Sequence, residues 1–197
     1  MLAVGAATAH RRRALLAAAA AAVAGGVLPA AARAQDPAFP DFPREVAGPG
    51  GRRLALNGVG ARRFFGFEVY RAALYLPAVP ARDAAAVLAL PGPKVLRVLY
   101  TRDAPERSIV SGWEESFARG ECRCAMPAAL RARLRAVRAG EVETYVFFPG
   151  HAEVAYGDER PTRVEGADAA RRMLLAFIGP EAQSEGLRRG LLGHGNG

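Results

Sequence analysis

Lysine is almost absent from this chain of 197 residues, since Lys94 is the one lysine among 27 basic side chains. Arginine, alanine and glycine all have GC-rich codons, so we interpret the arginine excess as codon composition and not as a nucleic-acid-binding surface. With only 2 cysteines the chain cannot be a disulfide-dense mini-protein. A content of 51% hydrophobic and 23% charged residues excludes a disordered or collagen-like chain and fits one globular domain.

Several signatures of catalysis and of metal or cofactor binding are also missing. The chain has no Gly-x-Ser-x-Gly motif, which argues against a serine hydrolase. Its 3 histidines have no metal-ligand spacing, and Cys122 and Cys124 have no histidine nearby, so we expect no metal site. These two cysteines are either free thiols or a strained, redox-labile bridge. Gly58-Val59-Gly60 resembles part of a dinucleotide fingerprint, but strand-like residues follow it where a helix is required, so we expect no cofactor.

Long hydrophobic runs are missing as well, except at the N-terminus. The apolar run of residues 14–28 is shorter than the roughly 20 residues that span a bilayer. Three arginines precede it, and Ala32-Arg33-Ala34 follows as a small-x-small cleavage site. This order predicts a secretory signal peptide at residues 1–34 and a mature domain at residues 35–197, in the periplasm or secreted. Arg12-Arg13 also fits a twin-arginine signal, so both Sec and twin-arginine export remain open.

The signal segment also accounts for much of the charge. Its four arginines and no acidic residue make up half of the net charge of +8, which leaves a modest excess on the mature domain. Such a domain is not a polyelectrolyte binder, and we expect no nucleic-acid partner. No later segment is long and apolar enough to suggest a transmembrane span.

Hydrophobic periodicity and turn residues predict an α+β domain. Asn57-Gly58 predicts a hairpin turn between the first two strands. Two helices carry clear apolar stripes at helical spacing, which suggests that helices cover an antiparallel sheet. The expected strands are residues 52–56, 63–76, 94–101, 142–148, 153–156 and 162–164. The expected helices are residues 83–90, 103–120, 128–139, 167–178 and 184–193.

One group of residues suggests a binding site. Arg62 and Tyr70 are eight residues apart, an even separation that places both on one face of a strand if no bulge intervenes. A guanidinium beside a phenol on an apolar sheet face can hold a carboxylate, phenolate or enolate. Tyr75 lies further along the same strand. The alternative, that these are ordinary strand residues with Arg62 facing water, remains open.

Several segments resemble the chalcone isomerase-like family. Residues 54–62, Leu-Ala-Leu-Asn-Gly-Val-Gly-Ala-Arg, and 67–77, Phe-Glu-Val-Tyr-Arg-Ala-Ala-Leu-Tyr-Leu-Pro, are similar to its opening. The resemblance covers roughly residues 46–193 and implies an open-faced β-sandwich, in which a large antiparallel sheet carries helices on one face with a ligand cleft between. Its later motifs are Gly92-Pro-Lys94, Phe147-Phe-Pro-Gly150, Ile178-Gly179 and Leu187-Arg-Arg-Gly-Leu-Leu-Gly193.

The resemblance also suggests what the site does. Arg62 falls where the plant enzymes of the family have an arginine that stabilises the substrate phenolate and the developing enone charge. Their other site residues are replaced here, by Tyr70 on the strand, by Arg107 and Glu114 on a helix, and by Ala176 on a later helix. Glu114 would bring negative charge to a phenolate site. The pattern is closer to the non-catalytic branch, whose plastid members bind fatty acids through arginine and tyrosine.

We therefore expect an exported protein that binds a small amphipathic anion, such as a fatty acid, or an aromatic ligand. Arg62 would pair with the head group, and Tyr70 would donate a hydrogen bond. An alternative is an intramolecular lyase of chalcone isomerase type with Arg62 as its catalytic residue. A further alternative is a non-catalytic periplasmic scaffold whose own side chains fill the cleft. The expected ligand-binding residues are Arg62, Tyr70, Tyr75, Trp113, Phe117, Met173 and Phe177.

Overall fold

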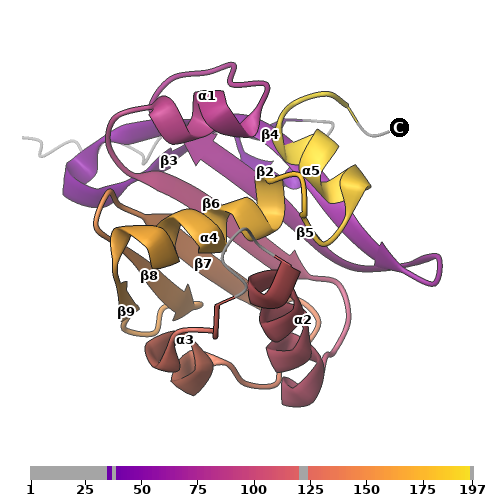
Figure 1. Ribbon diagram of the computed structural model, residues 1–197. Coiled ribbons are helices and arrows are strands. Elements are labelled where there is room, and N and C mark those ends of the chain that lie inside the picture. The colour runs from indigo at the N-terminus through magenta and orange to yellow at the C-terminus, as the bar shows by residue number, and fades with distance from the viewer. Residues whose placement is uncertain (1–34, 37–38, 120–123, 196–197) are drawn as a thin grey trace, which may run out of the picture. The chain divides into compact units, whose positions relative to one another are not determined.

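A seven-stranded antiparallel sheet forms the centre of the protein in a computed structural model, which describes residues 35–36, 39–119 and 124–195 (Figure 1). The strands lie in chain order, each paired with its sequence neighbour. They are β3 (Glu45–Ala47), β4 (Arg53–Phe64), β5 (Phe67–Leu76), β6 (Lys94–Tyr100), β7 (Val142–Phe147), β8 (His151–Tyr156) and β9 (Thr162–Glu165). A separate pair, β1 (Gln35–Asp36) and β2 (Phe39–Pro43), precedes the sheet, and a 3-10 turn (Pro49–Gly51) joins β3 to β4.

The helices cover one face of this sheet, which confirms the predicted α+β architecture (Figure 1). They are α1 (Ala84–Ala89), α2 (Glu106–Arg119), α3 (Ala128–Arg133), α4 (Ala167–Ile178) and α5 (Glu185–Leu191). No helix in the described part of the chain has the length and apolar character needed to cross a bilayer. The expected signal peptide, residues 1–34, lies outside the described residues.

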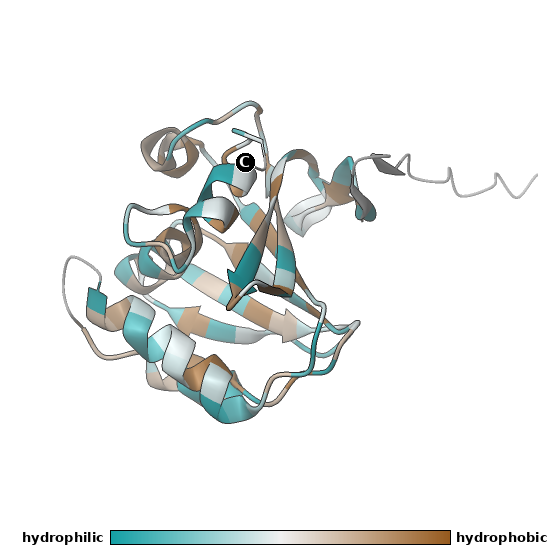
Figure 2. Cartoon of the chain, turned by 90° about the vertical axis from the view of Figure 1, so that its right-hand side faces the viewer, coloured by the Kyte–Doolittle hydropathy of each residue, from teal (hydrophilic) through white to brown (hydrophobic). Residues whose placement is uncertain are grey.

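Alternating burial along the strands explains why the helices collect on one side. In β7 and β8 every second residue is buried, so one face of each strand packs against the helices. The alternation is visible as bands of different hydropathy along the strands in Figure 2. β5 differs because apolar residues on both of its faces are buried: Leu74 lies under the helices, whereas Tyr75 joins Phe42 and Val46 on the opposite face.

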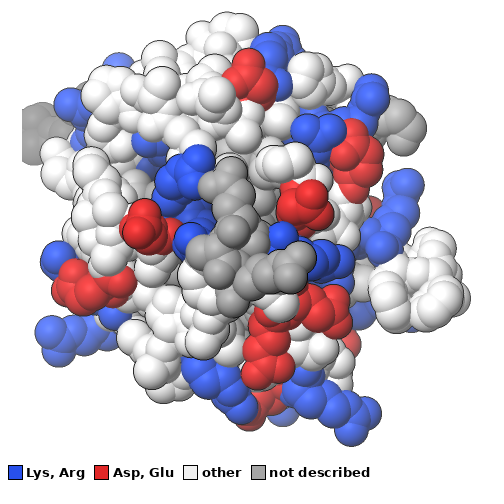
Figure 3. Space-filling view, viewed as in Figure 1, with Lys and Arg blue, Asp and Glu red and all other residues white. Residues whose placement is uncertain are grey.

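The predicted hairpin turn at Asn57-Gly58 is wrong. β4 runs through this pair with a shift of register, and the turn to β5 is made by Phe65-Gly66 between the paired residues Phe64 and Phe67. This hairpin end forms the uncharged lobe at the right of Figure 3. The side chain of Asn57 instead ties β4 to two other segments. It donates to the carbonyls of Ala81 (3.0 Å) and Leu191 (2.8 Å) and accepts from the Ala81 amide (2.8 Å).

The Gly58-Val59-Gly60 motif serves backbone packing. A Cβ atom on Gly58 would collide with the carbonyl oxygen of Gly190, and one on Gly60 would collide with that of Leu187. In the same way, a Cβ atom on Gly190 would collide with the carbonyl oxygen of Val59. The first two glycines lie in β4 and Gly190 lies in α5, so helix and strand meet backbone to backbone.

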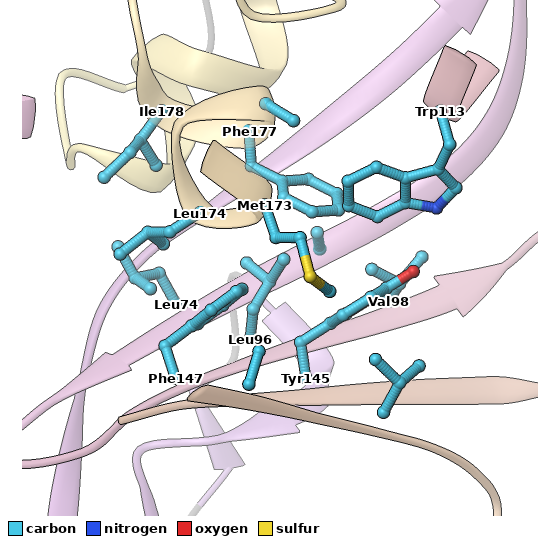
Figure 4. Packing of buried hydrophobic residues seen from close by; sticks show 14 of the residues in the cluster. Leu74, Leu96, Val98, Trp113, Tyr145, Phe147, Met173, Leu174, Phe177 and Ile178 are labelled. Atoms are coloured by element: carbon cyan, nitrogen blue, oxygen red, sulfur yellow. The ribbon is translucent and has the colours of Figure 1, made fainter. Parts of the chain in front are cut away.

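The α4 stripe that periodicity predicts packs on the sheet. Met173, Leu174 and Phe177 are all buried against residues of β5, β6 and β7 (Figure 4). The helix expected over residues 128–139 is shorter than predicted and ends at Arg133. The chain then becomes extended, because Val137 exchanges both backbone hydrogen bonds with Ala104, at 3.0 and 2.9 Å.

The close approach of β4 and α5 generates a stability prediction. Gly60→Ala should lower the free energy of unfolding by at least about 2 kcal/mol, because the added methyl group has backbone on the other side and cannot be accommodated by a rotamer change. Gly150→Ala is the matched control, since nothing lies within 4 Å of its Cβ position. It should stay within about 0.5 kcal/mol of wild type. Urea unfolding measures both, and equal stabilities would contradict the packing argument.

Candidate functional site

A cleft of about 920 Å³ opens between the helix-covered face of the sheet and α2. Its walls come from β4 to β7, from α2 and the segment before it, from Phe177 on α4 and from the loop that follows. The volume is within the range of clefts that hold small-molecule ligands.

A row of polar side chains crosses the sheet at this cleft. Arg62 on β4 pairs directly with Tyr70 on β5, and Tyr70 pairs with Tyr100 on β6. Directly opposed residues of neighbouring strands share a face of the sheet, so the three side chains lie side by side. The guanidinium carbon of Arg62 is 6.0 Å from the centre of the Tyr70 ring. Arg62 and Tyr70 thus share a face as predicted, but across a hairpin and not along one strand.

Arg62 is held in place from the helical side. Its Nη1 donates to Oε1 of Gln183, in the loop between α4 and α5. Gln183 is itself anchored to α2, because its Nε2 donates to Ser116 Oγ (2.8 Å) and to the Gly112 carbonyl (3.1 Å). Within the described ranges, Arg62 has no acidic ion-pair partner. The guanidinium is therefore oriented toward the cleft with hydrogen-bonding capacity to spare.

A buried carboxyl group, Glu143 on β7, lies at the other end of the polar row. Its side chain lines the cleft and is 0% exposed, and Tyr100 donates to its Oε2 at 2.7 Å. Burial raises the pKa of Glu143, while three tyrosine hydroxyls and Arg133 oppose this effect only in part. The other two tyrosines are Tyr145 and Tyr156. No described residue hydrogen-bonds to the second oxygen, Oε1.

The phenols of the cleft are neutral donors near neutral pH. Burial raises the pKa of Tyr70 to about 12, although Arg62 acts in the opposite direction. Burial and the neighbouring Glu143 also raise the pKa of Tyr100 and of Tyr145 well above the ordinary value. The described residues contain no group of three His, Cys, Asp or Glu side chains that could hold a metal ion. The polar row therefore offers an oriented arginine, several hydroxyl donors and one buried acid. Four further charged side chains line the cleft: Arg102, Asp103, Arg107 and Glu115.

Four of the predicted site residues line this cleft. Trp113 from α2 and Phe177 from α4 form an apolar wall, with their ring centres 5.6 Å apart, beside Arg62 and Tyr70. Glu114, which by resemblance would have brought negative charge to the site, lies instead in a separate pocket with Cys124.

The other three predicted residues lie outside the cleft. Phe117 packs behind Trp113 at 6.1 Å between ring centres, and Met173 is fully buried in the core. Tyr75 is on the opposite face of the sheet, because it is an odd number of residues from Tyr70. Cys124, for its part, is disulfide-bonded, and Cys122 lies outside the described residues.

Two residues of the site were missed by sequence reasoning. Gln183 lies in a loop with no motif, so no signal could have identified it. Glu143 could have been found, because it alternates with the apolar Tyr145 and Phe147 and therefore occupies a core-facing position of β7. A single acidic residue at such a position is unusual and indicates a functional or hydrogen-bonded role.

Glu143 generates a prediction about pH. Because its pKa is raised in the folded state, the folded protein binds this proton more tightly, and stability should fall as pH rises above 4.5 toward the raised pKa. Glu143→Gln cannot lose a proton, so its stability relative to wild type should increase with pH. The gain should reach about 1.4 kcal/mol for each unit by which the pKa is raised.

Urea unfolding between pH 4 and pH 8 tests this prediction, because it gives the difference in the free energy of unfolding between variant and wild type at each pH. Glu165→Gln is the control, since Glu165 is an exposed residue at the edge of the sheet. A stability difference for Glu143→Gln that does not change with pH would show that its carboxyl is not buried as described.

Comparison with known proteins shows which family model and which solved structure the chain is similar to. Residues 40–193 match a family model described as chalcone isomerase-like. No curated protein sequence matches the chain. Among solved structures, a fatty-acid binding protein of Arabidopsis thaliana is similar, with a TM-score of 0.52, 15% sequence identity, and coverage of 75% of this chain and 95% of that chain. At this identity the similarity shows a common fold.

Proposed function

Since the chain belongs to the chalcone isomerase-like family, we propose that its cleft binds a small amphipathic anion such as a fatty acid. The observation that carries this proposal is Arg62, a guanidinium that Gln183 orients into a cleft of about 920 Å³. The similar structure from Arabidopsis thaliana belongs to a protein described as fatty-acid binding, which supports the same class of ligand.

The polar row has Arg62 at one end and Glu143 at the other, which favours one orientation of such a ligand. A carboxylate pairs with Arg62 through charge-assisted hydrogen bonds, and the Tyr70 hydroxyl is a further donor beside it. When it is ionised, Glu143 makes its end of the row unfavourable for an anionic head group. The apolar part then extends from Arg62 along Val98, Trp113 and Phe177.

The head-group contact predicts a clear order of affinities. Arg62→Ala should weaken fatty-acid binding about 30- to 1000-fold, because the carboxylate loses its charged partner in a poorly hydrated site. Arg62→Lys should recover only part of this, since an ammonium does not reproduce the planar fork. Tyr70→Phe should cost about 1 kcal/mol, roughly fivefold, because one hydrogen bond is lost and the ring is kept.

Calorimetric titration with fatty acids of increasing length measures these affinities. Arg53→Ala is the matched control, because Arg53 is an exposed arginine of the same strand that pairs with Glu45 and does not line the cleft. Equal affinities for wild type and Arg62→Ala would remove Arg62 from the site. Tight binding of a fatty-acid methyl ester would argue against recognition of an anion.

An intramolecular lyase is the second candidate, and the same residues favour it. In ring closure of a hydroxychalcone, the phenolate oxygen adds to the β-carbon of the enone and the α-carbon takes up a proton. Arg62 and the neutral hydroxyl of Tyr70 are positioned to stabilise the negative charge on the enone oxygen. Turnover of a hydroxychalcone by wild type and its loss in Arg62→Ala would establish this reaction. Binding without turnover would leave the ligand-binding function.

Export of the protein is part of the proposal. Ala32-Arg33-Ala34 is the supporting feature, and we expect the mature chain to begin at Gln35 and to lie in the periplasm or be secreted. Intact-mass measurement of the protein from its own host tests this expectation. A mass that retains residues 1–34 would contradict it. If export uses the twin-arginine route, replacing Arg12 and Arg13 by lysine should block it.

A further inference from the structure

The hairpin between β4 and β5 ends in three exposed phenylalanines. The exposed fraction is 59% for Phe64, 86% for Phe65 and 59% for Phe67. In the part of the chain that the structure describes, Val79 is the one other large hydrophobic residue that is exposed to a similar degree. The tip projects away from the sheet as the uncharged lobe of Figure 3. Three aromatic rings collected on one projecting turn form a surface of the kind that marks an interaction site.

The fold itself does not require a phenylalanine at the turn. Phe65 and Gly66 are the two central residues of the turn, and both have positive φ, +49° and +80°. A two-residue turn with positive φ at both positions favours asparagine or glycine, and a bulky side chain is disfavoured there. Phe65 therefore occupies a strained position while its ring is turned to solvent, so its contribution to fold stability does not account for its presence.

Arginines accompany the aromatic tip. Arg63 is exposed next to Phe64, and the guanidinium carbon of Arg102 lies 4.6 Å from the centre of the Phe67 ring. Neither arginine forms an ion pair with another described residue, so both are available to an external anion. Phe64 and Arg102 also line the cleft, which places the tip at its mouth.

We propose that this tip, formed by Phe64, Phe65 and Phe67 with Arg63 and Arg102, inserts into the interface of a lipid bilayer that carries anionic head groups. The phenylalanine rings would enter the boundary between head groups and acyl chains, which is the usual depth of peripheral apolar anchors. The arginines would remain at head-group level and pair with anionic lipids. This orientation would turn the cleft mouth toward the surface at which amphipathic anions accumulate.

Co-sedimentation of the full chain with lipid vesicles tests the proposal. Wild type should bind vesicles of phosphatidylglycerol and phosphatidylethanolamine and should bind phosphatidylcholine vesicles far more weakly. Phe65→Asn should reduce binding to the anionic vesicles about tenfold, because one ring no longer leaves water. Arg63→Gln should reduce it about fivefold and only on anionic vesicles. Val79→Asn, which removes an exposed apolar residue elsewhere, should have no effect.

Phe65→Asn also separates this role from folding. Asparagine suits the turn better than phenylalanine, so the melting temperature of the variant should be equal to or above that of wild type. Its affinity for a free fatty acid should be unchanged, because Phe65 does not line the cleft. A Phe65→Trp variant should show quenching by brominated acyl chains at the tip, while Trp113 stays buried.

Three results would overturn the proposal: no binding of wild type to anionic vesicles, equal binding of Phe65→Asn, or equal binding to phosphatidylcholine. Phe65-dependent self-association in place of vesicle binding would assign the tip to a second copy of the chain and would also overturn it. None of these results bears on fatty-acid affinity. Conversely, vesicle binding by a chain that binds no fatty acid would overturn the proposed ligand and leave the bilayer contact.

Discussion

The backbone contact between β4 and α5 is the constraint on which the cleft depends. Glycines on both elements allow strand and helix to touch without intervening side chains. This contact holds α5 against β4, and the loop that precedes α5 brings Gln183 to Arg62. Asn57 reinforces it by binding the carbonyl of Leu191 at the end of α5. One strand therefore carries Arg62, the glycines that contact α5 and one side of the exposed hairpin.

The overall architecture follows from the amino-acid pattern. Period-two alternation and the apolar stripe of α4 predict a helix-covered antiparallel sheet, and both depend on burial, which is a strong local signal. Turn residues are a weaker signal than burial. Taken in isolation, Asn57-Gly58 fits a hairpin turn, although β4 runs through it. Its side chain instead satisfies backbone groups of Ala81 and Leu191, which lie far away in the sequence. Phe65-Gly66 carries no turn signature at its first position, so the true turn could not be identified from local preference.

The site was predictable only where strand geometry was enough. Arg62 and Tyr70 share a face because they pair across the hairpin. Tyr75 is on the same strand as Tyr70 but falls on the other face, because an odd number of residues separates the two. Phe117 was predicted to line the site but packs behind Trp113. An apolar stripe on a helix does not show which of its residues face a cleft and which face the core. Gln183 depends on the docking of α5, a contact between distant parts of the chain that no local pattern encodes.

The strand order has a consequence for how the site comes into being. Each strand of the sheet pairs with its neighbour in chain order, so paired residues are at most 53 residues apart, the separation of Lys94 and Phe147. The contacts that complete the cleft are different: Arg62 and Gln183 are separated by 121 residues, and Asn57 and Leu191 by 134. The sheet can therefore form before the C-terminal helix docks. The cleft is therefore completed late in folding, when the final helix docks on a strand that formed early.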